Sequence, residues 1–107
     1  MIKVYLENTK GDYKATGIYN EKTNELELLS GSKVFLDVPY IESFNTDRII
    51  NQRYGKIDDD IVIDNIMFKS PSTAGSFVTG RSCNGLTAWK DKEGRSIKEL
   101  IGKKSDK

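Results

Sequence analysis

The chain contains no histidine and only one cysteine, Cys83. Histidine is the usual general base near pH 7, the usual partner of a nucleophilic serine or cysteine, and the commonest transition-metal ligand. A lone cysteine can form neither an internal disulfide nor a thiolate zinc cluster. The sequence therefore predicts a protein that is not an enzyme and that has no metal site and no cofactor. A small hydrolase that uses carboxylates alone is the remaining enzymatic alternative.

Long apolar runs are also missing. The longest, Ile61 to Ile63 and Ile66 to Phe68, are far too short to cross a bilayer. The residues from Met1 to Tyr5 alternate between apolar and polar, unlike the basic and then apolar start of a secretory signal peptide. We therefore expect a cytoplasmic protein that makes no membrane contact.

A length of 107 residues, with 36% hydrophobic and 31% charged residues, is typical of one soluble globular domain. The net charge of +1 conceals an asymmetry along the chain. Residues 1–66 carry eight Lys or Arg against twelve Asp or Glu, whereas residues 67–107 carry nine against four. A basic last third is compatible with a surface that contacts phosphates, but solvated helices and tails show the same segregation.

Apolar residues alternate with polar ones over residues 2–6, which predicts a strand with one buried face. A second strand is expected from Tyr13 to Tyr19, where Gly17 marks a bulge or a close backbone approach. A third centres on Leu26 and Leu28. Because the connections between these segments are short, the pattern indicates an antiparallel meander.

The middle of the chain is less regular. Lys33 to Phe35 is expected to add a short strand. The apolar spacing from Tyr40 to Tyr54 suits one helical face that ends at Gly55, although residues 45–47 could interrupt the helix. The β-branched run from Ile61 to Phe68 indicates a buried strand, or two short ones divided at Asp64 and Asn65.

Two helices are predicted in the last third from their end signals. Ser70 can cap a helix whose first residue is Pro71 and which ends at Gly80. Its expected buried stripe consists of Ala74, Phe77 and Val78. Ser96 and Glu99 have the spacing of a capping box for a final helix, after which residues 102–107 should fray.

The segment between these helices contains turns and one short strand. Asn84 and Gly85 favour a turn with positive φ, Thr87 to Lys90 would be a strand that carries Trp89, and Asp91 to Gly94 would be another turn. The predicted fold class is α+β, with an antiparallel sheet of four to six strands and two or three helices packed on one face.

Several short motifs follow one another in order. They are Phe-Lys-Ser-Pro-Ser-Thr-Ala at 68–74, Gly-Arg-Ser-Cys-Asn-Gly at 80–85, Trp-Lys at 89–90 and Asp-Lys-Glu-Gly-Arg at 91–95. This order resembles a bacterial domain family of unknown function that is often found at the C-terminus of GIY-YIG nuclease-family proteins. It is similar in turn to the RAMA domain, which is named for its association with restriction enzymes and adenine methylases and is proposed to recognise modified DNA. The resemblance covers about residues 13–101, although Gly75 stands where that family favours alanine and no nuclease motif accompanies the domain.

The resemblance implies a non-catalytic accessory module that binds nucleic acid, including modified duplex DNA, in a restriction or nuclease context. The start of the helix at Ser70 offers free backbone N–H groups at a positive helix end, and an aromatic ring can stack on a base. The candidate nucleic-acid-binding residues are Lys69, Ser70, Ser72, Arg81, Asn84, Trp89, Lys90 and Arg95.

Each of these features also has a purely structural explanation. Ser70 can serve only as a helix cap, Trp89 as a core residue and Asn84 as a turn former. The acidic run from Asp58 to Asp60 lacks calcium-loop spacing and is expected to be a solvated loop. The rival function is a protein-interaction or oligomerisation module that recruits a nuclease or methylase through a sheet edge or an apolar patch.

Overall fold

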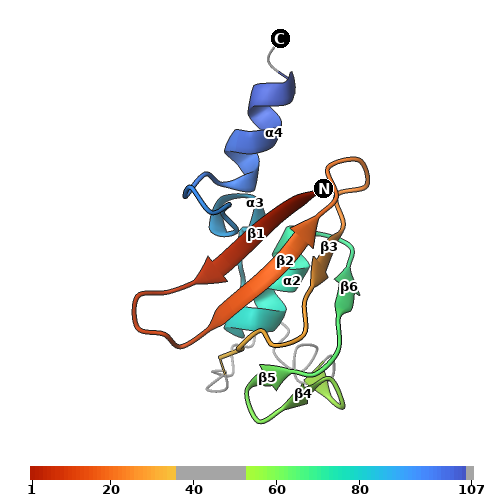
Figure 1. The fold of residues 1–107 in the computed structure, drawn as a ribbon, viewed down its shortest axis with the longest axis vertical. Helices are drawn as coiled ribbons and strands as arrows, with labels where there is room; N and C mark the ends of the chain where they lie inside the picture. Colours follow the sequence, from red (N-terminus) through yellow and green to blue (C-terminus); the bar gives the residue numbers. More distant parts are fainter. Residues whose placement is uncertain (36–52, 106–107) are drawn as a thin grey trace.

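The computed structural model describes residues 1–35 and 53–105, and it has an α+β fold (Figure 1). A four-stranded antiparallel sheet has the order β1-β2-β3-β6, and β4 and β5 pair in a separate two-stranded ribbon. The described elements are β1 (Ile2–Glu7), β2 (Lys14–Tyr19), β3 (Leu26–Leu28), β4 (Ile57–Asp58), β5 (Ile61–Val62), β6 (Ile66–Phe68), α2 (Pro71–Thr79), α3 (Gly85–Ala88) and α4 (Ile97–Ser105). The predicted fold class is confirmed. None of the described helices is long and apolar enough to span a membrane.

The predicted meander forms the first three strands of the sheet. Gly17 lies opposite Val4 on one side and Leu28 on the other, and the register is regular in both directions. A Cβ atom on Gly17 would lie 2.7 Å from Cδ2 of Leu26. The glycine therefore permits a close approach between β2 and β3, and the bulge alternative is wrong.

Helix α2 lies behind the sheet in Figure 1 and covers one of its faces. Its predicted stripe is confirmed, because Ala74, Phe77 and Val78 are all fully buried. The ring of Phe77 packs at a tilt against that of Phe68, with centroids 5.2 Å apart. This contact joins α2 to the edge strand β6 and closes that side of the core.

Both ends of α2 are where the sequence predicts them. The Oγ of Ser70 accepts a hydrogen bond from the N–H of Thr73 at 3.2 Å, and Pro71 occupies the first helical turn. Gly80 ends the helix in the left-handed conformation at a φ of +76°, and its N–H donates to the carbonyl of Ser76. Left-handed backbone costs glycine little, which explains its place here.

Arg53 is a feature of the core that the sequence does not reveal. Its guanidinium is buried, donates to the carbonyls of Phe77 and Val78, and lies 5.7 Å from the ring of Phe77. Burial lowers the pKa of Arg53 to about 10. A cation here satisfies the free carbonyls and the negative dipole at the C-terminal end of α2.

Two predictions for the middle of the chain need correction. Lys33 makes only isolated bridges, to Lys14 and Ile61, so Lys33 to Phe35 is not a regular strand. The run from Ile61 to Phe68 forms two short strands, β5 and β6, which confirms the second alternative. It is not buried throughout, because Ile61, Ile63 and Met67 are exposed. Most of the helix predicted for Tyr40 to Tyr54 lies outside the described residues.

The segment around Trp89 was also mispredicted. Residues 85–88 form the one-turn helix α3, so the strand from Thr87 to Lys90 is wrong. Asn84 precedes α3 at a φ of −88°, and Gly85 is not among the positive-φ glycines, so the predicted positive-φ turn is also wrong.

Helix α4 begins with the predicted capping box. The N–H of Ser96 donates to Oε1 of Glu99, and the N–H of Glu99 donates to Oγ of Ser96. Ile97 is fully buried, whereas Leu100 and Ile101 are half-buried. The helix packs mainly on α3 and points away from the sheet in Figure 1.

Candidate functional site

Two of the predicted contact residues, Ser72 and Trp89, join the start of α2 to α3. The Oγ of Ser72 accepts a hydrogen bond from the N–H of Gly85 at 3.0 Å. The indole N–H of Trp89 donates to the carbonyl of Pro71 at 3.0 Å. A Cβ on Gly85 would overlap the backbone of Pro71 and Ser72, so α3 touches α2 directly at this glycine. Sequence motifs more than ten positions apart therefore form one structural joint.

Three of the residues expected to contact a ligand, Ser70, Ser72 and Trp89, make hydrogen bonds within the fold instead. Trp89 is fully buried, as the core alternative requires, so it offers no face on which a base could stack. The hydroxyl of Ser70 is shared with the N–H and hydroxyl of Thr73, which matches the capping alternative. Asn84 is exposed and its side chain makes no capping hydrogen bond.

Two of the predicted basic residues, Lys69 and Arg81, flank the two ends of α2. Lys69 is exposed beside the N-terminal end of α2, whereas Arg81 is exposed just beyond its C-terminal end. A nine-residue α-helix is about 13 Å long, so these two cations lie at opposite ends of it.

The other two predicted cations lie in the connection from α3 to α4. Lys90 is exposed, and its backbone pairs with that of Tyr5 at the edge of β1. Arg95 makes ion pairs of 2.9 Å with both Asp91 and Glu93. The charge of Arg95 is therefore already compensated within its own loop.

Arg81 lines a cleft of about 460 Å³ that opens between the β1–β2 turn and the end of α2. The described residues around it are Asn8, Thr9, Lys10, Asp12, Tyr13, Phe35, Thr79 and Arg81. The turn side is shaped by Asn8, whose side chain accepts from the N–H of Asp12 and donates to its carboxylate. On the helix side, the N–H of Phe35 donates to the carbonyl of Val78.

The cleft carries two cations, one carboxylate and two aromatic rings. Neither Lys10 nor Arg81 makes an ion pair with any residue that the structure describes, whereas the carboxylate of Asp12 is held by Asn8. Tyr13 and Phe35 are both half-buried. Such a cleft can hold an anion beside a flat, apolar group.

The hydroxyl of Tyr13 is surrounded by titratable groups. Burial raises its pKa, the neighbouring Cys83 and Asp12 raise it further, and Arg81 acts in the opposite direction. Because the ordinary value is already 10, the phenol is protonated at neutral pH and can donate a hydrogen bond.

Cys83 has a packing role beside α2. It is half-buried, and burial raises the pKa of its thiol, which therefore stays protonated. A Cβ on Gly75 would lie 2.5 Å from the Cys83 sulfur. The thiol thus occupies the space that a side chain at position 75 would need.

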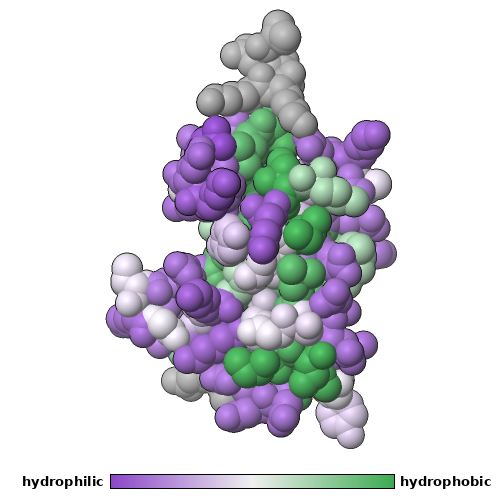
Figure 2. All heavy atoms as spheres, viewed as in Figure 1, coloured by the Kyte–Doolittle hydropathy of each residue, from purple (hydrophilic) through white to green (hydrophobic). Residues whose placement is uncertain are grey.

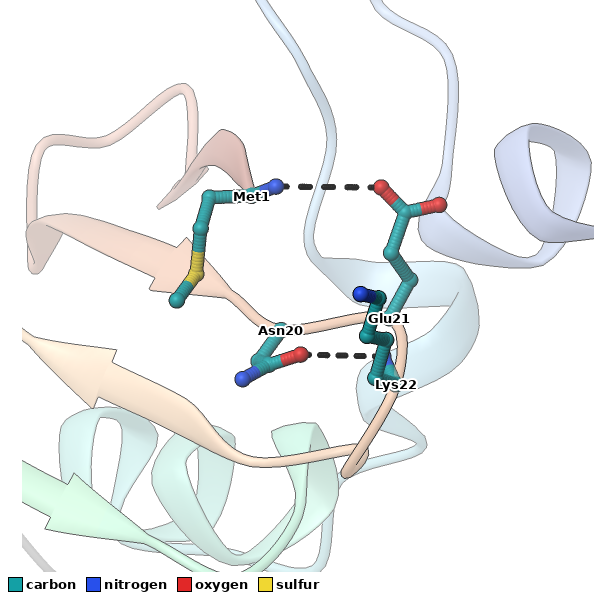
Figure 3. Close-up of a pocket in the computed structure, with 4 residues that line it drawn as sticks. All are labelled: Met1, Asn20, Glu21 and Lys22. Atoms are coloured by element: carbon teal, nitrogen blue, oxygen red, sulfur yellow. Dashed lines mark hydrogen bonds and ion pairs between the residues drawn. The ribbon is translucent and has the colours of Figure 1, made fainter.

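The acidic run from Asp58 to Asp60 and a second hollow are weaker candidates for a functional site. In residues 1–35 and 53–105, no group of three or more His, Cys, Asp or Glu is placed to hold a metal ion. Asp60 pairs with Lys33 at 3.9 Å. The second hollow, of about 420 Å³, lies beside the N-terminus, where the ammonium of Met1 pairs with Glu21 at 3.8 Å (Figure 3). The Met1 ammonium and the Asn20 side-chain oxygen of this hollow already have partners in Glu21 and the Lys22 N–H, so the cleft at Arg81 is the better candidate.

The fold and the cleft define a small α+β domain whose sheet is covered by a helix on one face and whose turn-side cleft is cationic. A family model matches residues 4–101, and the chain belongs to that family, a domain of unknown function termed DUF4357. The match begins earlier than residue 13, where the sequence resemblance was placed, so β1 is part of the family domain. No curated protein and no solved structure matches the chain.

Proposed function

We propose that this domain is a non-catalytic, cytoplasmic accessory module that binds nucleic acid in a restriction or nuclease context, as its resemblance to GIY-YIG-associated and RAMA domains implies. The observation that supports it is the cleft at the β1–β2 turn, whose two cations, Lys10 and Arg81, lack an ion pair among the described residues. An anionic polymer is the natural partner of such a pair of cations.

The residue types suit phosphate in particular. The guanidinium of Arg81 has the planar fork that matches two phosphate oxygens, and Lys10 adds a compact charge on the opposite side of the cleft. Lys14 is exposed at the start of β2, so a third cation stands at the same end of the sheet. Phosphate contacts of this kind orient a protein on a strand without reading its sequence.

The test is binding to a short DNA duplex over a salt series. If Lys10 and Arg81 neutralise two phosphates, log affinity should fall with log salt at a slope of about −2, and Arg81→Gln should flatten it to about −1. Lys22→Gln is the matched control, because it removes the same charge from an exposed residue at the far end of β2.

Two results would contradict the proposal. The first is the absence of any salt-dependent binding to DNA or RNA at low ionic strength. The second is an equal loss of affinity in Arg81→Gln and Lys22→Gln, because general charge and not the cleft would then be responsible.

The second candidate function is a protein-interaction module, which one specific observation favours. The exposed fractions of Ile61, Ile63 and Met67 are 38%, 48% and 59%, and apolar surface gathers over β4 and β5 on the face seen in Figure 2. Exposed apolar patches commonly mark protein contacts. If the domain is an interaction module, replacing Ile63 and Met67 by serine should abolish its association with a second protein chain, as measured by sedimentation. Its DNA affinity should stay unchanged.

A further inference from the structure

We infer that the cleft accepts one unstacked base of a nucleic-acid strand, with the adjoining phosphate on Arg81 and Lys10. This inference rests on the proposed function and specifies which part of the ligand enters the cleft.

The size of the cleft suits one base and not a stacked run of bases. Its volume of about 460 Å³ falls in the range of pockets for small ligands, roughly 300 to 1,000 Å³. Among the described residues, it is bounded by the β1–β2 turn on one side and by the end of α2 on the other. Bases in a duplex are stacked inside the helix, and a base reaches a protein pocket only after it leaves the stack.

The two aromatic rings supply the surface on which a base can stack. Tyr13 enters the cleft from the end of the β1–β2 turn, and Phe35 enters from the segment that is hydrogen-bonded to the end of α2. Both are half-buried, so each ring is held in place and yet presents part of its surface. Stacking on aromatic side chains is available to every base, because each has a flat π face.

Few polar groups remain to read the edge of the base. The side chain of Asn8 is occupied by Asp12, and the hydroxyl of Thr79 donates to the carbonyl of Gly75. The hydroxyl of Tyr13 makes no hydrogen bond to the residues that the structure describes, so it is a lining group that remains free to contact the edge of the base. We therefore expect the cleft to prefer a strand with an unstacked base over a strand that lacks the base, and to show a weaker preference among the four bases.

The experiment compares three fluorescently labelled DNA probes by anisotropy at low salt. One is a perfect duplex, one carries a single bulged thymine, and one carries a single bulged abasic residue. The two bulged probes have the same number of phosphates, so electrostatics does not separate them. The base-containing bulge should bind about tenfold more tightly than the abasic bulge, because stacking one base is worth about 1–3 kcal/mol.

Variants then assign the preference to the cleft. Tyr13→Leu should bring the ratio between the two bulged probes close to one, whereas Arg81→Gln should weaken both probes by a similar factor. Tyr5→Leu is the control, because Tyr5 is also a half-buried tyrosine but lies on β1 outside the cleft. Circular dichroism of each variant establishes that it is folded.

The comparison of the two bulged probes on the unaltered protein tests the inference even if Tyr13→Leu does not fold. Equal, salt-dependent binding of the base-containing and abasic bulges would overturn the inference and leave the proposed function standing. Failure of all three probes to bind would overturn both.

Discussion

Gly85 is important because it has no side chain at the contact between α2 and α3. Its N–H donates to Ser72, and its Cα lies against the backbone of Pro71, so the two helices touch without an intervening side chain. At the other end of α3, the buried indole N–H of Trp89 donates to the carbonyl of Pro71. The Ser-Pro-Ser, Asn-Gly and Trp-Lys motifs thus share one structural cause, the joint between α2 and α3.

Gly85→Ala is expected to destabilise the domain by about 3 kcal/mol or more, because the new methyl group meets backbone that cannot move aside without separating the helices. Urea unfolding measures the change in free energy. Gly102→Ala is the control, since Gly102 lies within α4 and a Cβ there meets nothing within 4 Å. That change should stabilise by roughly 0.5–1 kcal/mol through helix propensity. Equal midpoints for Gly85→Ala and the unaltered protein would contradict the close contact.

Residue roles of this kind could be predicted only in part. The sequence offered two explanations for Trp89, a core residue or a stacking platform, and could not decide between them. Its burial depends on Pro71, which is distant in sequence, and on the absence of a side chain at Gly85. Such contacts leave no local periodic pattern. Arg53 was missed for the same reason, because its partners are carbonyls on α2, more than twenty positions away in the sequence.

Elements were predicted well wherever their ends carry local signals. The caps at Ser70 and Ser96 and the glycine at Gly80 depend on hydrogen bonds within three or four residues, which the sequence shows directly. Helix α3 has only one turn and begins with a glycine, so no propensity favours it. The helix is stabilised by its contact with α2. The local sequence does not show this contact, and it therefore predicts a strand there instead.

The loop before α4 depends on one carboxylate. The pKa of Asp91 is lowered chiefly because the backbone N–H of Arg95 donates to it, with the N–H of Glu93 and the Arg95 guanidinium also contributing. A lowered pKa means that the folded state binds this proton less readily than the unfolded state does. The stabilisation is therefore complete above the ordinary value of 3.8 and is lost as pH falls through the lower, folded-state pKa.

Asp91→Asn should accordingly reduce stability at pH 7, and the difference from the unaltered protein should shrink as pH falls below about 4. Urea unfolding between pH 7 and pH 2 measures this difference. Arg95→Gln removes the guanidinium but keeps the backbone N–H, so it should retain most of the pH dependence. If Arg95→Gln abolished that dependence, the ion pair and not the backbone hydrogen bond would be its main cause.

At the scale of the whole molecule, the candidate site was only partly predictable. Arg81 was identified from the sequence, but the chain folds so that α2 separates it from Lys69, and a local ion-pair network compensates Arg95. The neighbours of Arg81 in the cleft, Lys10 and Tyr13, come from the β1–β2 hairpin. A cleft between segments so distant in sequence is a product of the tertiary fold, and neither charge segregation nor motif order indicates it.

The core is shared by elements from both ends of the chain, which predicts that the domain unfolds as one unit. The residues Val4, Leu28, Phe77, Trp89 and Ile97 are all fully buried and belong to one cluster that extends from β1 to α4. A single core of this size normally gives a two-state transition. Trp89 is the only tryptophan, so its fluorescence reports the joint between α2 and α3, whereas far-ultraviolet circular dichroism reports helices and strands throughout.

The two signals should therefore give the same urea midpoint and the same slope. Ile97→Ala tests whether α4 is part of this unit, because it removes a fully buried side chain at the start of that helix. It should lower the free energy of unfolding by about 2–5 kcal/mol and shift both midpoints together to lower urea. Lys98→Ala, an exposed neighbour in the same helix, should leave both midpoints unchanged within about 0.5 kcal/mol. A fluorescence midpoint that fell while the circular dichroism midpoint stayed in place would mean that α3 and α4 unfold separately from the sheet, and the shared core would then not be one cooperative unit.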